Sequence, residues 1–352
     1  MNTEENKRIR KSKATNPAAS LIAALKFVAV AQKKAQSSQQ QFCVISGNRV
    51  TASNGVLTIS SKFEEDLEAC PHTSMFIKAL SKVKENMSIT QHSPTAIVVK
   101  SGAFSAVVPC VEFGDLVMPA PDERCALIDD RIKEAFKVLA PLATEGYTPE
   151  YLASVLLQSG SAIATNGFVL AEYWHSFDLP PNMLIPKAAA LAIAKAKKPL
   201  TGFGYSGSSA TFWFEDDSFI KTQLFSERYP GFQSLLNCGG GASPRQVPEE
   251  FYKAVHSLKS FFRIVYFEDD GIASHEEDGS EFTYKIEGLP SGMAFEAKYL
   301  LTVESSFKNV HFDKDSNKAY FFGENVRGVV SGFERPKPET ECLEESTSDQ
   351  SF

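Results

Sequence analysis

The spacing of apolar residues along the chain predicts six amphipathic helices. Apolar positions return every three or four residues in six stretches, which places them on one side of a helix. The stretches are residues 17–36, 73–86, 129–143, 186–198, 248–263 and 295–308. Shorter runs between them are apolar or alternate, as half-buried strands do. The clearest of these runs are 41–45, 56–60, 96–99, 155–158, 210–214 and 319–322.

The order of these elements repeats along the chain. Ala-Ser-Asn-Gly at 52–55 returns as Ala-Thr-Asn-Gly at 164–167, an offset of 112 residues, and a looser copy starts at Ala273. Three units of this length account for nearly all of the 352 residues, and each has the size of a small domain. The sequence therefore predicts an α+β protein of three similar domains, each with two helices packed on antiparallel sheet.

Short polar segments separate the predicted strands and domains. The two Asn-Gly pairs, at 54–55 and 166–167, predict tight hairpin turns in which both central residues have positive φ. We place the domains at 17–121, 122–240 and 241–333, with a glycine-rich linker at 238–244. Residues 1–16 carry a net charge of +3 and residues 334–352 a net charge of −4. Neither end has a periodic apolar pattern, so we expect both to be mobile.

Composition is that of an ordinary globular protein. Apolar residues make up 43% and charged residues 22% of the chain. No run of about eighteen apolar residues exists, so no membrane span is expected. The first residues lack the apolar segment of a secretory signal. The six cysteines form no CxxC pair, which favours reduced thiols in a cytoplasmic protein over a disulfide framework.

Charge is unevenly distributed between the predicted helices and the rest. The whole chain has a net charge of −7, whereas the six helical stretches together carry +10. Lysines occupy the solvated face of any helix, but a bias in all six helices favours a surface that holds a polyanion. No zinc-finger or RNP-type pattern occurs, so contacts to phosphates are expected, not to bases. Neither a cofactor nor a metal is indicated by any motif.

Five short segments, in order along the chain, resemble one known family. Residues 163–171 (IATNGFVLA) are similar to the family segment ATDGHRLA, and 224–232 (LFSERYPGF) to LxxGRFPDY. Residues 109–113 (PCVEF) resemble PAxDFP, and 295–301 (FEAKYLL) resemble FNxxYLL. Residues 329–333 (VVSGF) fall where the family ends in VVMPM. Together with the internal repeat, these matches resemble the bacterial DNA polymerase III beta subunit, the sliding clamp, as a divergent phage-type member.

The resemblance implies both an architecture and a function. Two chains would pair head to tail into a closed ring of six domains, with the basic helices lining the hole. Such a homodimer encircles duplex DNA without sequence preference and tethers a replicative DNA polymerase, after a clamp loader has placed it there. It is a processivity factor in DNA replication and not an enzyme, and it needs no cofactor. No membrane partner is expected.

The resemblance also implies two sets of site residues. The candidate DNA-binding residues are Lys33, Lys34, Lys133, Lys137, Tyr151, Lys187, Lys195, Lys197 and Lys198. Polymerase and loader peptides would bind an apolar groove between the second and third domains. The candidate peptide-binding residues are Leu152, Thr165, Gly167, Leu170, Pro230, Leu235, Tyr299, Val329, Val330 and Phe333. Ser-Gly-Phe at 331–333 departs from the family ending, so a different peptide preference is expected, or a tail that covers the groove.

Two other functions remain open from the residues alone. A clamp-like regulator that never forms a loadable ring has the same sequence features. A metal-dependent nuclease would need converging acids, and the runs at 268–270 and 276–278 are the candidates. Both runs fall in predicted turns, where solvated acidic loops are more common than metal sites.

Overall fold

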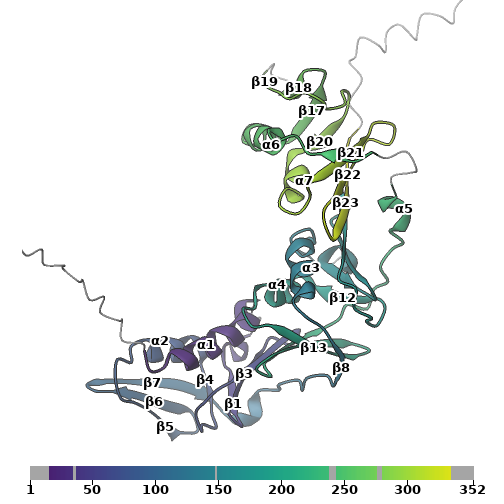
Figure 1. Ribbon diagram of the computed structural model, residues 1–352. Coiled ribbons are helices and arrows are strands. Elements are labelled where there is room, and N and C mark those ends of the chain that lie inside the picture. The colour runs from purple at the N-terminus through teal and green to yellow at the C-terminus, as the bar shows by residue number, and fades with distance from the viewer. Residues whose placement is uncertain (1–15, 35–36, 147–148, 238–242, 276–279, 334–352) are drawn as a thin grey trace, which may run out of the picture. The chain divides into compact units, whose positions relative to one another are not determined.

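The computed structural model describes residues 16–34, 37–146, 149–237, 243–275 and 280–333 (Figure 1). The charged ends predicted to be mobile and most of the glycine-rich linker lie outside the described residues. The chain forms two compact units, which are described separately. Unit 1 consists of Met1–Leu127 and Ala196–Gln223, and unit 2 consists of Ile128–Lys195 and Leu224–Phe352.

Among its described residues, unit 1 contains two α-helices and two antiparallel sheets. Helix α1 (Ala19–Val28) continues as the 3-10 helix η1 (Ala29–Lys34) and packs beside α2 (Thr73–Ser81). The smaller sheet has the strand order β4 (Cys70–Pro71), β7 (Phe104–Val111), β6 (Ala96–Ser101), β5 (Met87–Ser93). The larger sheet has the order β1 (Val44–Ser46), β2 (Arg49–Ser53), β3 (Leu57–Lys62), β15 (Phe219–Gln223), β14 (Ser209–Phe214), β13 (Leu200–Ser206), β8 (Arg124–Leu127).

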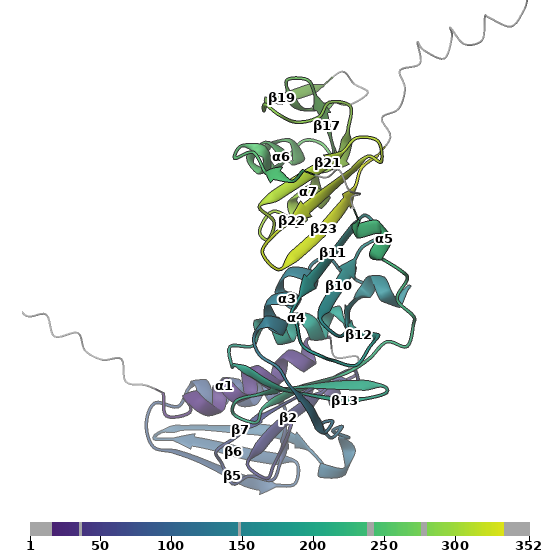
Figure 2. The same cartoon turned by 45° about the vertical axis from the view of Figure 1, so that its right-hand side comes forward.

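Unit 2 repeats this plan with two pairs of helices. The pairs are α3 (Arg131–Leu139) with α4 (Lys187–Lys195), and α6 (Phe251–Lys259) with α7 (Ala297–Thr302). Its larger sheet has the order β12 (Met183–Pro186), β9 (Ser154–Leu157), β10 (Ser161–Thr165), β11 (Val169–Trp174), β23 (Val326–Ser331), β22 (Lys318–Phe322), β21 (Asn309–Asp313), β16 (Arg245–Gln246) (Figure 2). Its smaller sheet has the order β19 (Glu281–Lys285), β18 (Gly271–His275), β17 (Ile264–Glu268), β20 (Ala294–Glu296).

Helix α3 shows how the apolar spacing produces this packing. Its buried residues are Ile132, Ala135, Phe136 and Leu139, which follow the i, i+3, i+4, i+7 pattern of a helix with one apolar face. That face rests on β10 and β11, while α4 packs alongside. The predicted pairing of two helices with an antiparallel sheet in each repeat is therefore confirmed.

Each larger sheet joins strands from two successive repeats. In unit 1, β3 pairs with β15, and in unit 2, β11 pairs with β23. In each pairing, the two strands lie on opposite sides of a predicted domain boundary. The domain boundaries stay a prediction. The β3–β15 and β11–β23 pairings mean that neighbouring repeats complete one another's sheets.

The two Asn-Gly turns have the same structure, although it differs from the predicted one. Gly55 and Gly167 have φ of 89° and 91°, but Asn54 and Asn166 keep negative φ. The prediction that both turn residues have positive φ was therefore wrong. The Asn54 side-chain oxygen accepts hydrogen bonds from the N–H groups of Val56 and Leu57, at 3.0 and 2.8 Å. An Asn side chain that closes the turn in this way leaves only the glycine in the left-handed region.

Helix and strand ends also differ from their predictions. The stretch 295–308 begins in strand β20, and its helix α7 ends at Thr302. The stretch 41–45 begins in a 3-10 turn, Gln39–Gln41, and its strand β1 starts only at Val44. Apolar side chains continue through such ends because they face the core in either conformation, so periodicity does not mark them.

A buried ion pair joins β15 to the segment before β8. Lys221 donates to the carboxylate of Asp122 at 2.9 Å, and the hydroxyls of Ser209 and Thr211 each donate to it at 2.8 Å. Burial by itself would raise the pKa of Asp122, but these hydrogen bonds from Lys221, Thr211 and Ser209 bring it below its ordinary value. The carboxylate is therefore charged and fully partnered inside unit 1.

The described cysteines are free thiols, as predicted. Cys43, Cys70 and Cys110 are buried and Cys125 is exposed, while Cys238 and Cys342 lie outside the described residues. Burial raises the pKa of Cys43 to about 12 and those of Cys70 and Cys110 to about 11. These three thiols therefore stay protonated and unreactive. None of the described helices combines the length and apolar composition needed to cross a membrane.

Candidate functional site

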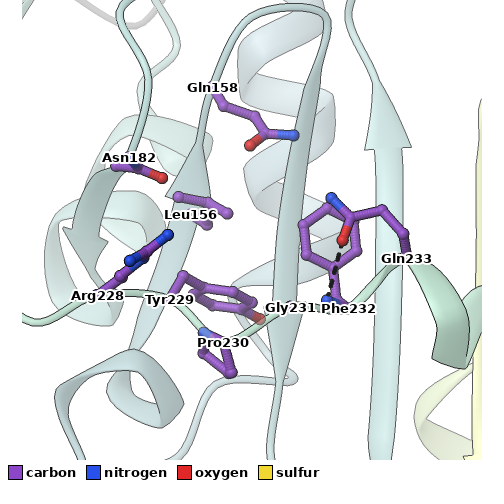
Figure 3. Close-up of a pocket in the computed structure, with 9 residues that line it drawn as sticks. All are labelled: Leu156, Gln158, Asn182, Arg228, Tyr229, Pro230, Gly231, Phe232 and Gln233. Carbon is purple, nitrogen blue, oxygen red and sulfur yellow. Dashed lines mark hydrogen bonds between the residues drawn. The ribbon is translucent and has the colours of Figure 1, made fainter.

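A hollow of about 440 Å³ lies on unit 2 beside β9 and the segment that leads into α5 (Gln233–Leu236). Figure 3 shows its lining, with Asn182 and Arg228 to one side of Leu156 and Phe232 and Gln233 to the other. The lining residues are Leu156, Gln158, Asn182, Arg228, Tyr229, Pro230, Gly231, Phe232 and Gln233. Arg228 is the one charged residue among them. The hollow is thus a carboxamide-rich surface with a positive charge and no acid.

An apolar cluster forms one wall of this hollow and continues across the sheet. Leu170 on β11 lies directly opposite Val329 on β23, and Tyr320 on β22 lies opposite Val329 on the other side. The buried members of the cluster are Leu156, Ile163, Leu170, Leu184, Tyr229, Phe232, Leu236, Tyr320 and Val329. Tyr151, Phe225 and Phe322 pack on it and are only partly buried. Segments far apart in sequence therefore meet on one face of the larger sheet.

Two glutamates fix the segment before α5 against the 3-10 helix η4 (Glu150–Ala153). The Glu150 carboxylate accepts hydrogen bonds from the N–H groups of Ser226 and Glu227, both at 3.2 Å. The Glu227 carboxylate accepts one from the N–H of Tyr151 at 3.0 Å. These reciprocal bonds hold both carboxylates against backbone N–H groups, and neither carboxylate forms an ion pair with Arg228.

The same contacts set the position of Tyr229. Its ring meets that of Tyr151 edge to face, with centroids 5.7 Å apart, and that of Phe232 at 6.1 Å. Burial raises the pKa of the Tyr229 hydroxyl above its ordinary value, and Tyr151 adds to the shift. This hydroxyl is buried and makes no hydrogen bond to any described residue. Buried polar groups are ordinarily hydrogen-bonded, and this hydroxyl has no partner within the described part of the chain.

A second aromatic group stands where the described chain ends. The Phe168 ring stacks on that of Tyr299, with centroids 4.8 Å apart, and lies 6.2 Å from that of Phe333. Phe168 keeps 40% of its surface exposed. The Phe333 backbone is fixed, since its N–H donates to the Ala294 carbonyl at 2.8 Å and its carbonyl accepts from the Asn317 amide. This aromatic cluster of Phe168, Tyr299 and Phe333 therefore has a rigid position.

The predicted peptide-binding residues lie at several places on unit 2. Leu170 and Val329 belong to the apolar cluster, Pro230 lines the hollow, and Leu235 is exposed on α5. Tyr299 and Phe333 belong to the aromatic cluster, which Thr165 and Gly167 approach through the β10–β11 turn. Leu152 is half-buried in η4. Val330 is fully buried, and because side chains alternate along a strand it points to the opposite face from Val329.

Sequence reasoning missed several residues of this surface. Leu236 rather than Leu235 packs into the cluster, together with Phe232, which lies four residues earlier. That i, i+4 spacing was the available signal, but a helix this short gives too few positions to fix its phase. Tyr151 packs at the edge of the apolar cluster and is only partly buried, and its contact with DNA stays a prediction. Gln158 and Asn182 had no signal, since single carboxamides occur on any surface.

Four of the predicted DNA-binding lysines extend into solvent. They are Lys33 on η1, Lys137 on α3, Lys195 at the end of α4, and Lys197 just after it. Lys137 is 3.5 Å from Glu134, but its side chain remains 70% exposed. Lys34 also belongs to η1. The ammonium groups of Lys33, Lys137, Lys195 and Lys197 are available to a polyanion.

The other three predicted lysines are held by the protein. Lys198 pairs with Asp216 at 2.6 Å, donates to two serine hydroxyls, and lies 4.7 Å above the Phe27 ring. Lys187 donates to the Ala143 carbonyl at 2.6 Å. Lys133 is 3.2 Å from Asp130, and only 11% of its side chain is exposed. Acids compensate the charges of Lys198 and Lys133, and the Ala143 carbonyl holds the Lys187 ammonium in place, so a phosphate gains less from all three.

The acidic run 268–270 lies at the β17–β18 turn, and 276–278 lies outside the described residues. Among the residues that the structure describes, no three His, Cys, Asp or Glu side chains gather as metal ligands.

Comparison with solved structures identifies the class of fold. No family model and no curated protein matches the sequence. The chain has the fold of the bacterial DNA polymerase III beta subunits, the sliding clamps, over 90% of its length. The resemblance predicted from the five short segments is therefore confirmed at the level of fold.

Three clamps illustrate the likeness. The Bacillus subtilis sliding clamp has a TM-score of 0.76 at 14% identity, with 97% of that chain covered. The Helicobacter pylori beta clamp bound to a DNA ligase peptide has a TM-score of 0.73 at 17% identity, with 98% covered. The Pseudomonas aeruginosa clamp bound to griselimycin has a TM-score of 0.75 at 13% identity, with 97% covered. Each comparison covers 90% of the present chain.

Proposed function

We propose that this protein is a DNA sliding clamp: a homodimer that closes around duplex DNA and tethers a DNA polymerase to it. The observation that carries the proposal is the clamp fold combined with the charge distribution. An acidic chain of net charge −7 places exposed lysines on its helices. A surface of this kind attracts phosphates while the remainder of the molecule repels them.

The internal repeat supports a specific way of joining two copies. The strand that follows the first turn, β3, pairs with β15, and its counterpart β11 pairs with β23. In the third repeat the corresponding strand is β19, which forms the edge of its sheet. In the first repeat the counterpart of β15 and β23 is β7. In the described part of the chain, β4 pairs with β7 only at Cys110 and Val111, leaving most of that side open.

The β3–β15 and β11–β23 pairings also suggest a register for the proposed pairing between β19 and β7. Thr58 and Leu170 each lie three residues after the turn glycine, and they face Lys221 and Val329. In the third repeat the corresponding glycine is Gly279, and the residue three positions after it is Phe282. On the other side, Lys221 and Val329 pair with the third residues of β14 and β22. The third residue of β6 is Val98, and its partner on β7 is Val107. Phe282 of one copy would therefore face Val107 of the other.

The surface chemistry of both strands fits this joint. Val107 is 63% exposed and Phe282 is 42% exposed, unusual values for large apolar residues within strands. The Phe282 ring stacks on Phe261, with centroids 4.6 Å apart, and Phe261 is itself 60% exposed. A second copy that added β19 to β7 would cover all three side chains. Because each copy carries both strands, two such joints close a ring without free ends.

The hold on DNA is electrostatic and non-specific in this proposal. Lys33, Lys137, Lys195 and Lys197 contact phosphates, and Lys34 supplements them. Lysine suits a sliding contact because its ammonium is a hydrated point charge on a flexible stem. Encirclement, not affinity, keeps the protein on DNA, so individual contacts can be weak.

Partner proteins bind through a short peptide on the larger sheet of unit 2. The Helicobacter pylori clamp, which shares this fold, binds a DNA ligase peptide. Apolar side chains of the peptide pack on the apolar cluster and the aromatic cluster. The carboxamides of the hollow set the orientation of the peptide. A polymerase and a clamp loader are the expected partners. The protein acts by tethering, without catalysis, in the cytoplasm of the cell that replicates the DNA.

Two measurements test the proposal. Light-scattering mass should be about twice 38.6 kDa at micromolar concentration. Protein loaded onto a nicked circular plasmid should remain bound through gel filtration in high salt and be lost once a restriction enzyme linearises the plasmid. Equal retention on circular and linear DNA would rule out encirclement and leave a clamp-like binding protein that does not close.

A further inference from the structure

The hollow beside α5 has a charge that no described residue neutralises. The Arg228 guanidinium forms no ion pair within the part of the chain that the structure describes, although acids outnumber bases in the protein. Glu227, its neighbour in sequence, and Glu150 accept backbone hydrogen bonds instead. Together with the buried unpartnered hydroxyl of Tyr229, this makes a surface prepared for an acidic ligand.

The chain itself contains a segment of matching chemistry. Residues 334–352 carry six acids and two bases, a net charge of −4. Within them the apolar pair Cys342-Leu343 is flanked by Glu341 on one side and by Glu344 and Glu345 on the other. An apolar side chain with acids around it suits a surface where an apolar cluster borders an arginine.

The attachment point of this segment lies on the same sheet as the hollow. Val329 belongs to the apolar cluster with Tyr229 and Phe232. Phe333 follows four residues later, so it lies at most about 14 Å from Val329. Its backbone is pinned to Ala294 and Asn317. A segment of nineteen residues that starts there can return to the hollow, since even half of it spans about 30 Å when extended.

We propose that residues 334–352 occupy the hollow and its apolar wall as a built-in competitor of partner peptides. Leu343 contacts the apolar cluster, and the adjacent glutamates pair with Arg228. Tethering gives the segment an effective concentration on the order of millimolar. A segment with a dissociation constant near 0.1 mM would then weaken an external peptide about tenfold. Only partners that bind strongly, or at several points, would displace it.

The native Cys342 allows the contact to be trapped in the full-length protein. Gln233→Cys places a thiol in the lining of the hollow. Under oxidised glutathione we expect a disulfide between position 233 and Cys342 within one chain, identified by peptide mass mapping on non-reduced monomer. Lys308→Cys, exposed elsewhere in unit 2, is the matched control, and Gln233→Cys combined with Cys342→Ser should give no such product. Equal trapping at positions 233 and 308 would overturn the proposal.

A binding measurement tests the competition itself, which rests on the proposed function. The full-length protein with Glu341→Gln, Leu343→Ser, Glu344→Gln and Glu345→Gln should bind a fluorescein-labelled DNA ligase peptide about tenfold more tightly than the parent in fluorescence anisotropy. Unchanged affinity would show that the segment does not compete. If the ligase peptide binds neither protein while position 233 still traps Cys342, the segment occupies the hollow and the proposed peptide groove is wrong.

Discussion

The side chains of Asn54 and Asn166 perform the same task at two points of the chain. Each accepts hydrogen bonds from the backbone N–H groups two and three residues ahead, at 2.8–3.0 Å. Ser53 and Thr165 each accept one from the following glycine's N–H, at 3.1 and 3.0 Å. Two turns that agree in every one of these bonds indicate one structural unit used twice. Because the turns are equivalent, the register of the β3–β15 and β11–β23 pairings can be applied to the proposed pairing of β19 with β7.

Single charged substitutions at the proposed contact between copies should dissociate the dimer, and combining two opposite charges should restore it. Val107→Lys or Phe282→Glu alone buries a charge against an apolar partner, so each variant should sediment as a monomer at micromolar concentration. The double variant places the two charges opposite each other and should recover much of the dimer. Val117→Lys is the control, because Val117 is 86% exposed and lies outside both strands. A double variant as monomeric as the single ones would mean that the register is wrong.

The lysines near the end of α4 should separate into two functional types. Lys195→Glu with Lys197→Glu should weaken association with DNA and reduce the slope of log K against log salt by about two units. Lys198→Ala should leave that slope nearly unchanged and destabilise the fold by about 1–2 kcal/mol, since Lys198 is bonded to Asp216, Ser61 and Ser218. Urea denaturation and salt-dependent anisotropy give the two readouts. If Lys198→Ala flattened the salt slope, its phosphate contact would outweigh its internal bonds.

Phe333→Ala should weaken partner peptides without affecting the dimer. The ring is half-buried beside Phe168 and Tyr299, so its removal opens the aromatic cluster and should cost about 1–3 kcal/mol in peptide affinity by calorimetry. Val330→Ala is the comparison, because its side chain points to the opposite face. That change should lower the free energy of unfolding and leave the affinity alone. Equal peptide affinity for Phe333→Ala and the parent would place the groove elsewhere.

The buried pair of Asp122 and Lys221 predicts a specific pH dependence of stability. The pKa of Asp122 is lowered in the folded protein, so its contribution is fully present above the unfolded value of about 3.9 and is lost as pH falls below it. Asp122→Asn leaves Lys221 without its charge partner and should cost about 3–5 kcal/mol at pH 7. Urea titrations should show the gap between parent and variant narrowing below about pH 4. A gap that stays constant down to pH 3 would exclude this carboxylate as its source.

The sequence predicted the elements of the fold better than the details of its surfaces. The six predicted helical stretches contain α1–α4, α6 and α7, and they were found because each buries one face, as Ile132 and Phe136 do in α3. The type of the Asn54 turn was not predictable from its residues, since it depends on where one side-chain oxygen points. The ion pair of Lys198 was not predictable, because position near a helix end carries no information about a partner such as Asp216, eighteen residues away. Similarly, Leu235 and Leu236 are the same residue type, so only the helical phase of α5 decides which of them packs into the apolar cluster.

The sheet of unit 1 has a consequence for how the protein is made. Its strand β3 ends at Lys62, but the neighbour that covers its outer edge, β15, is not complete until Gln223. A ribosome must therefore add some 160 further residues before that edge can pair. Until then the growing chain exposes an unpaired strand edge that can associate with other nascent chains. Slow synthesis between these two strands should therefore lower the yield of native protein, and faster translation or a chaperone that covers the β3 edge should restore it.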